Sequence, residues 1–426
     1  MRRLFATLAL AGLLCGFVLL TPTDSGNAQR AYSSFVGRFW LGDFGSGHFG
    51  IINNNVQTQT STGIAMETPF QSGWLWQYAQ AWNVPYVYWE TAPAGDPLKA
   101  DAQARLVSKW AWVKANWPNF SICGNVGSTP AQAMDDATWV SSGLIQLYDA
   151  TSDATALQDA ANLLTCAYAR WYTTQTGGGL AYCDASDTTG CPSPEPLTKA
   201  SYNGQFALAM LECAARGCSS GSISNLQMIA DAKGIADWAN AVEIRTSAVC
   251  PQSDSLYWMG VWLNGSTIVT AENECANPNN IAPASSVTQL SNNLSYAALN
   301  AKLSATYGSA YSTLATQTAA SILAKEVDPN GVLINDRDAR TALYGLLPFD
   351  TYVYPLLSPS QQAAWRSTML ATARSIVRQG AQPDGTYRPD WDVVWNTGWA
   401  ASTCSDQLEV GAQQPVAVIS ARTYGY

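Results

Sequence analysis

The sequence predicts an all-α protein in which paired helices close into a ring. Apolar residues recur at helical spacing in about eleven segments of the 426-residue chain. No linker divides the roughly 400 residues after the N-terminal segment, although a single compact core of that length is unusual. Period-two patterns are short: the apolar run from Leu256 to Leu263 fits a β-hairpin arm within a loop. Helical hairpins joined in a ring would make one domain of such a chain.

Each predicted helix carries apolar residues at i, i+3 or i+4 and i+7, and turn-forming residues separate several of them. The loop signals include Gly177–Gly179, Asp328–Gly331 and Pro383–Gly385. In chain order the predicted helices are Trp74–Tyr88, Ala102–Trp117, Asp135–Ala150, Leu157–Trp171, Tyr202–Cys213, Asn225–Ile244, Gln289–Leu303, Tyr311–Ala324, Ala339–Tyr354, Gln361–Arg378 and Cys404–Ala421.

The N-terminus has the pattern of an export signal. Arg2 and Arg3 precede an uncharged apolar run, Leu4–Leu20, and small residues precede a plausible cut before Gln29. The alternative is an uncleaved anchor, because the run is at the lower limit for a membrane span. We therefore expect a signal peptide over 1–28, an N-terminal extension over 29–65 and a main domain over 66–426. The protein would be secreted, periplasmic or cell-surface, and free of the membrane after cleavage.

The cysteines fit an oxidising compartment. The chain has 10 Cys, and no CxxC spacing indicates a metal or redox motif. We expect disulfides between Cys183 and Cys191 and between Cys213 and Cys218. Further pairings that the order of the cysteines allows are Cys250 with Cys275 and Cys123 with Cys166, and Cys404 is left over.

Composition excludes several classes of function. The chain has 1 histidine, His48, which leaves little scope for a Ser-His-Asp device or a catalytic zinc site. A net charge of −9 without a basic stripe argues against nucleic acid. No phosphate-binding glycine loop is present, and we expect no metal or cofactor. Carboxylates and aromatic rings remain, with 17 Trp and 19 Tyr, and these are the groups that glycosidases use.

Two adjacent carboxylates, Asp135 and Asp136, stand where a helical pattern begins. Side by side they repel each other, but unpaired N–H groups and the dipole favour negative charge at a helix N-terminus. The alternative is an N-cap followed by an acidic first residue. The apolar residues that follow have the spacing of one buried helix face and are Val140, Leu144, Leu147 and Tyr148.

The stretch from Asp135 to about residue 214 resembles glycoside hydrolase family 76, the endo-α-1,6-mannanases. Three elements carry the resemblance in the same order: Asp135-Asp136-Ala-Thr-Trp139, Gly177-Gly-Gly-Leu-Ala-Tyr182 and Lys199-Ala-Ser-Tyr-Asn203. The similarity extends over roughly 70–250 and becomes diffuse over 280–426, where Asn292-Asn293 stands for the family's Asn-Gln. This resemblance implies an (α/α)6 toroid of six inner and six outer helices.

The resemblance also implies a retaining glycosidase, with Asp135 as nucleophile and Asp136 as general acid/base. Adjacent residues at a helix start can reach the separation of about 5–5.5 Å that retention requires. The candidates for stacking on sugar rings are Trp139, Tyr182 and Tyr202, for which core packing is the alternative. Those for hydroxyl contacts are Asn203 and Asn292, for which loop or cap hydrogen bonding is the alternative. The substrate would be an α-1,6-mannan or related polysaccharide, and the protein a monomer.

The sequence departs from the family pattern at Leu180-Ala-Tyr182, where tryptophans are usual, and at Asn292-Asn293. The glycan could therefore differ while the chemistry is kept. Three alternatives stay open: a cell-wall transglycosidase of the same family, a glycan-binding toroid without catalysis, and a different α/α-toroid enzyme such as an epimerase or lyase. Those last enzymes commonly depend on histidine, of which the chain has 1.

Overall fold

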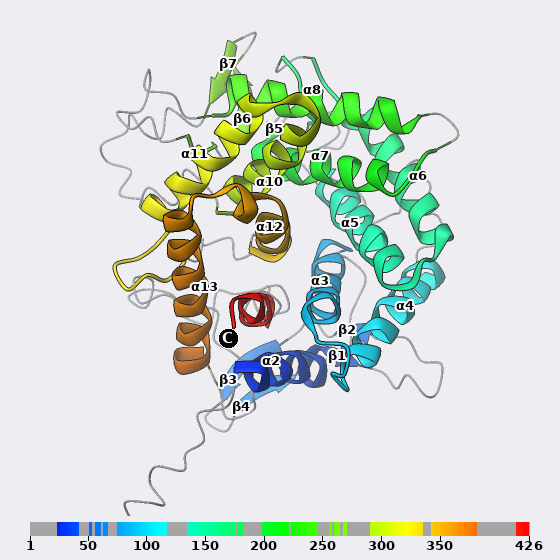
Figure 1. Cartoon of the computed structure of the whole chain (residues 1–426). Coiled ribbons are helices and arrows are strands. Elements are labelled where there is room, and N and C mark those ends of the chain that lie inside the picture. Colours follow the sequence, from blue (N-terminus) through cyan, green and yellow to red (C-terminus); the bar gives the residue numbers. More distant parts are fainter. Residues whose placement is uncertain are drawn as a thin grey trace, which may run out of the picture.

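A computed structural model gives the architecture. It describes residues 24–41, 51–52, 56–60, 63–66, 75–116, 134–174, 177–181, 198–220, 223–244, 255–257, 260–264, 267–270, 290–334, 342–380 and 415–425. Helices alternate along the chain between an inner and an outer circle, so the predicted (α/α)6 toroid of paired helices is confirmed (Figure 1). The outer helices are α2 (Asp24–Phe39), α4 (Lys99–Asn116), α6 (Ala154–Trp171), α8 (Asn225–Val242), α11 (Ser309–Lys325) and α13 (Pro359–Gly380).

The inner circle holds the alternate elements. They are α3 (Leu75–Thr91), α5 (Met134–Thr151), α7 (Ala200–Ala215), α10 (Leu290–Tyr307), α12 (Ala342–Pro348) and a C-terminal helix over 415–420. The helix α12 passes into a π-helix, η3 (Phe349–Val353), and a 3-10 turn, η4 (Tyr354–Leu356). The C-terminal helix ends in a 3-10 turn, η6 (Ala421–Tyr424).

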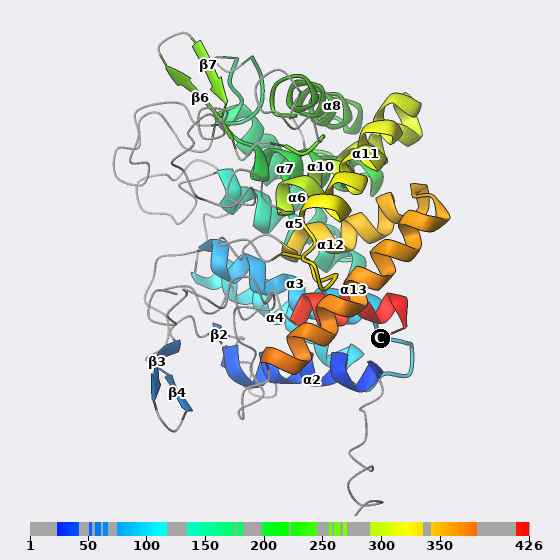
Figure 2. The same cartoon turned by 90° about the vertical axis from the view of Figure 1, so that its left-hand side faces the viewer.

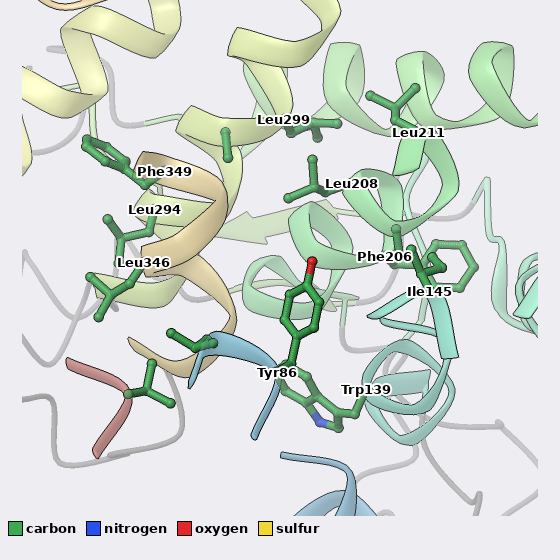
Figure 3. Close-up of a cluster of buried hydrophobic side chains, with 14 of the residues drawn as sticks. Tyr86, Trp139, Ile145, Phe206, Leu208, Leu211, Leu294, Leu299, Leu346 and Phe349 are labelled. Atoms are coloured by element: carbon green, nitrogen blue, oxygen red, sulfur yellow. The ribbon is translucent and has the colours of Figure 1, made fainter. Parts of the chain in front are cut away.

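Burial separates the two circles. The outer helix α11 buries one stripe, formed by Tyr311, Ala315, Thr318, Ala319 and Ile322. The inner helix α10 buries nearly its whole first three turns, because helices surround it on all sides. Buried apolar side chains of α3, α5, α7, α10 and η3 gather between the inner helices, among them Tyr86, Trp139, Phe206, Leu294 and Phe349 (Figure 3).

The ring closes where α2, α3 and the C-terminus meet. The ring of Tyr32 on α2 stacks on Tyr88 of α3 with centroids 4.3 Å apart. The guanidinium of Arg422 lies over the Tyr88 ring, 4.6 Å from its centroid. The same guanidinium pairs with the Asp96 carboxylate at 3.8 Å. The helix α2 was not predicted from the sequence. It lies partly within 29–65, so that segment supplies a ring helix (Figure 1).

A charged network joins the inner helices near their C-terminal ends. Arg216, the residue after α7, donates two hydrogen bonds to Asp149 of α5, at 2.5 and 2.6 Å, and also pairs with Glu212 of α7. Lys302 of α10 donates to Glu212 and to the hydroxyl of Tyr352 in η3, both at 3.0 Å. These bonds tie four inner segments together at this end.

Short antiparallel strands lie at the opposite end of the ring from this charged network. They are β1 (Trp40–Leu41) with β2 (Ile51–Ile52), β3 (Val56–Thr60) with β4 (Gly63–Met66), and the sheet of β5 (Thr198–Lys199), β6 (Gly260–Asn264) and β7 (Thr267–Thr270). The hairpin expected near Leu256–Leu263 is confirmed by β6 and β7. The hairpins β3–β4 and β6–β7 lie on the same side of the molecule (Figure 2).

The predicted disulfide between Cys213 and Cys218 is confirmed. Cys166 is also disulfide-bonded. Its expected partner, Cys123, and the cysteines at 183, 191, 250, 275 and 404 lie outside the described residues. Among the described residues, no helix is both long and apolar enough to cross a bilayer.

Candidate active site

Asp135 and Asp136 belong to the first turn of the inner helix α5, which begins at Met134. This confirms that the pair lies at a helix start; the positions of their side chains lie outside what the structure describes. This first turn is packed into the core, since Met134, Ala137 and Thr138 are fully buried. The Thr138 hydroxyl donates to the Met134 carbonyl at 3.0 Å. The unpaired N–H groups of this turn favour negative charge there.

The end of the ring that carries the strands is the end where inner helices begin. The sheet strand β5 runs directly into α7, and β4 precedes α3. Successive inner helices run in the same direction, because one outer helix separates each from the next. The start of α5 therefore lies at this end, between the starts of α3 and α7, and the start of α10 follows that of α7 around the circle.

The triple-glycine segment is a tight turn that packs on α8. Gly177, Gly178 and Gly179 have φ of 84°, 148° and 82°, which favour glycine. A Cβ at Gly179 would lie 2.6 Å from the ring of Trp238, so glycine is required by packing as well. The turn joins the end of α6 to Leu180, which bridges back to Tyr172.

Asn203, in the first turn of α7, holds this turn in place. Its Oδ1 accepts from the Leu180 N–H at 2.7 Å, and its Nδ2 donates to the Leu180 carbonyl at 3.1 Å. Neither Asn203 nor Leu180 has exposed surface. The second and third resemblance elements are therefore brought together by direct hydrogen bonds.

A buried polar network supports the starts of α7 and α10. The Tyr296 hydroxyl donates to Glu243 at the end of α8 at 2.6 Å, and Gly204 of α7 packs on the Tyr296 ring. Asn293 bonds the Tyr257 N–H at 2.8 Å and donates to Glu326 at 3.2 Å. Burial raises the pKa of Glu243 well above its ordinary value, which favours the neutral acid.

The remaining predicted site residues are distributed between the core and the helix starts. Trp139 is 2% exposed and Asn292 is fully buried. Tyr202 lies in the first turn of α7, but the structure does not describe its side chain. Tyr182 lies outside the described residues. The roles assigned to these five residues, Asn203 included, stay predictions.

The contacts of Trp238, Tyr296 and Glu243 were not predicted from the sequence. A single Trp or Glu at helical spacing reads as an ordinary helix residue, because its partner is far away in sequence. Within the described part of the chain, no group of three His, Cys, Asp or Glu side chains is arranged to hold a metal ion.

No family model matches the sequence, and no curated protein matches it. Solved structures do match its backbone. One is an inactive variant of an α-1,6-mannanase of glycoside hydrolase family 76 from a Salegentibacter species, with two adjacent aspartates replaced and α-1,6-mannotetraose bound. Its TM-score is 0.69 at 15% identity, covering 95% of this chain and 100% of that one.

A family 76 mannosidase from Bacteroides thetaiotaomicron matches with a TM-score of 0.67 at 13% identity, covering 94% of this chain and 98% of that one. An unsaturated glucuronyl hydrolase specific for heparin matches less well, with a TM-score of 0.54 at 9% identity over 93% of this chain and 96% of that one. The fold is therefore that of family 76 glycoside hydrolases, and the resemblance read from the motifs is confirmed at the level of the fold.

Proposed function

We propose that this chain, with the fold of family 76 mannanases, is an exported retaining glycosidase that cleaves α-1,6-mannan or a related α-mannosyl polysaccharide. The observation that carries the proposal is the Asp135–Asp136 pair in the first turn of an inner helix. The similar mannanase variant, inactive with two adjacent aspartates replaced and mannotetraose bound, supports the same assignment.

Asp135 would attack the anomeric carbon, and Asp136 would protonate the departing oxygen and then activate water. Two neighbouring carboxylates cannot both ionise easily, so one keeps a proton for the acid role. The helix start favours the charge of the other, the nucleophile. Tyr182 and Tyr202 would contact sugar rings, while the buried Trp139, Asn203 and Asn292 would support the groups that contact the sugar.

The test is product analysis on a panel of linear α-1,6-, α-1,2- and α-1,3-mannans, with α-1,6-glucan as a comparison. We expect oligosaccharide release from the α-1,6-mannan, and NMR of the first product should show the α-anomer. The matched control is the double variant Asp135→Ala/Asp136→Ala. Absence of products from every mannan, or equal products from the double variant, would overturn the proposal.

The same experiment separates the alternatives. A transglycosidase would give products longer than the substrate. A glycan-binding toroid would bind the polymer and release nothing, and the double variant would bind as well as the wild type. Export is tested separately: we expect the mass of the protein from a secreting host to correspond to cleavage before Gln29.

A further inference from the structure

The outer surface carries two pairs of tyrosines, one on each side of α8. Tyr168 and Tyr172 at the end of α6 form the first pair, and Tyr307 and Tyr311 at the turn from α10 to α11 form the second. Tyr172 and Tyr307 are equally exposed, at 41% and 40%. The two pairs differ in what already covers their rings.

The second pair is occupied by the protein itself. The ammonium of Lys233 lies over both rings, 5.3 Å from the centroid of Tyr307 and 5.7 Å from that of Tyr311. Asp237 holds both this ammonium, at 2.5 Å, and the Tyr311 hydroxyl. These contacts account for the second pair as a structural cluster.

The first pair is a rigid platform. The rings of Tyr168 and Tyr172 are stacked with centroids 4.8 Å apart and planes 28° apart, so one fixes the orientation of the other. Asp231 of α8 is a hydrogen-bonding neighbour of the Tyr168 hydroxyl and helps to raise its pKa, after burial. Gln227 holds Asp231 from the other side at 2.8 Å.

The surface beside Tyr172 is open. Asp231, Gly234 and Trp238 follow one another at i, i+3 and i+7 on one face of α8. Asp231 meets Tyr168 and Trp238 meets the triple-glycine turn, so Gly234 faces the stretch between them, where Tyr172 lies. A Cβ at Gly234 would meet nothing within 4 Å.

We propose that this Tyr172 surface, made of Tyr168, Tyr172, Asp231 and Gly234, binds sugar residues of a neutral polysaccharide outside the active site. An exposed aromatic ring such as that of Tyr172 stacks on the apolar face of a pyranose, and a carboxylate accepts hydrogen bonds from its hydroxyls. Asp231 and the net charge of −9 disfavour an anionic glycan. The surface adjoins the candidate site, because Tyr172 is bridged to Leu180, which Asn203 holds.

The kind of glycan rests on the proposed function, while the location of the binding surface does not. The experiment measures Kd for soluble α-1,6-mannan by affinity electrophoresis, in the Asp135→Ala/Asp136→Ala background so that the polymer stays intact. Tyr172→Ala should raise Kd about three- to tenfold, as expected for loss of one aromatic stacking contact. Gly234→Gln should raise it as well by covering the open surface, with no loss of helix stability.

Tyr307→Ala is the matched control and should leave Kd unchanged, since its ring is equally exposed but covered by Lys233. In the otherwise wild-type enzyme, Tyr172→Ala should leave kcat and KM on a short aryl α-mannoside unchanged. Polygalacturonate, an anionic polymer, should bind more weakly than mannan.

The proposal is wrong if Tyr172→Ala binds mannan within twofold of its parent, if Tyr307→Ala weakens binding equally, or if polygalacturonate binds better through Tyr172. It is also wrong if the parent binds none of the panel polymers. Failure of the proposed function is distinguishable: no polymer would be cleaved, yet binding that depends on Tyr172 would remain.

Discussion

Asn203 holds both polar backbone groups of one residue, Leu180, across 23 positions of sequence. Since both residues are buried, Asn203→Ala should leave a buried N–H and carbonyl without these partners. We expect a loss of about 2 to 4 kcal/mol in the free energy of unfolding, measured by urea denaturation. The kcat/KM of the folded variant should also fall, because the turn beside the candidate site loses the side chain that holds it.

The control for this change is Asn162→Ala, which removes a solvent-exposed bond from Gln158 within α6. Its free energy of unfolding should stay within about 0.5 kcal/mol of the wild type. An Asn203→Ala protein as stable as this control would show that the bonds to Leu180 contribute little.

The structure around Asn203 could be predicted from the sequence only in part. The apolar spacing from Tyr202 to Cys213 predicted a helix, and the three glycines predicted a turn, because both signals are local. Neither signal could reveal that Asn203 binds the turn, since that contact depends on how α6 and α7 pack. For the same reason the pairing of Glu243 with Tyr296 had no signal in the sequence.

The helix α2 was missed for a different reason. Its buried residues have helical spacing and are Ala28, Ala31, Tyr32 and Phe35. Two of these four are small alanines, and the residues between them are polar, so the apolar pattern is weak. The first five residues of the helix, 24–28, also lie within the predicted signal peptide, where they were interpreted as the cleavage region. Only its stacking on Tyr88, far along the chain, makes it part of the ring.

Two glycines with nearly equal φ allow the contribution of Trp238 to be isolated. Gly179 has φ of 82° and Gly217 has φ of 78°, but a Cβ meets the Trp238 ring only at Gly179. Gly217→Ala should lower the free energy of unfolding by about 1 kcal/mol through backbone strain alone. Gly179→Ala should cost about 2 to 4 kcal/mol, because the ring must also move. Equal melting temperatures for the two variants would show that Trp238 yields without cost.

Asp350 should make stability depend on pH. Its Oδ1 accepts from Trp365 at 2.8 Å and from Tyr424 at 2.6 Å, while its Oδ2 is shielded from solvent and has no hydrogen-bond partner among the described residues. Burial raises the pKa of Asp350 from 3.8 to about 7, although both bonds act to lower it. The folded state therefore keeps a proton that the unfolded state loses.

The proton held by folded Asp350 sets the direction of the pH dependence. The stabilisation is present in full below about pH 4 and is lost as pH rises through about 7, amounting to roughly 1 to 4 kcal/mol. Asp350→Asn cannot ionise, so its unfolding free energy should fall less between pH 4 and pH 8 than that of the wild type. Urea denaturation at a series of pH values measures the difference. Identical pH slopes for the two proteins would contradict the assignment to Asp350.

The roles of Asp135 and Asp136 can be separated by the leaving group of the substrate. On an aryl α-mannoside with an activated leaving group, no proton is needed for departure, so attack is the step that remains. Asp135→Asn should lose nearly all turnover on this substrate and on mannan. Asp136→Asn should keep the first step on the aryl substrate and fail on mannan, whose glycosidic oxygen must be protonated as it leaves.

Since Asp136→Asn also lacks the base for the second step, the covalent intermediate should accumulate, visible as an added mass on the intact protein. Azide needs no general base, so it should speed release and give a glycosyl azide of retained configuration. If the pair only stabilises the helix start, each variant should lose roughly 0.5–2 kcal/mol in the free energy of unfolding, and activity should fall only as far as the folded fraction falls. Activity and melting temperature are therefore measured together for both variants on both substrates. Two folded variants with near wild-type turnover would show that the pair is structural and that the chemistry lies elsewhere.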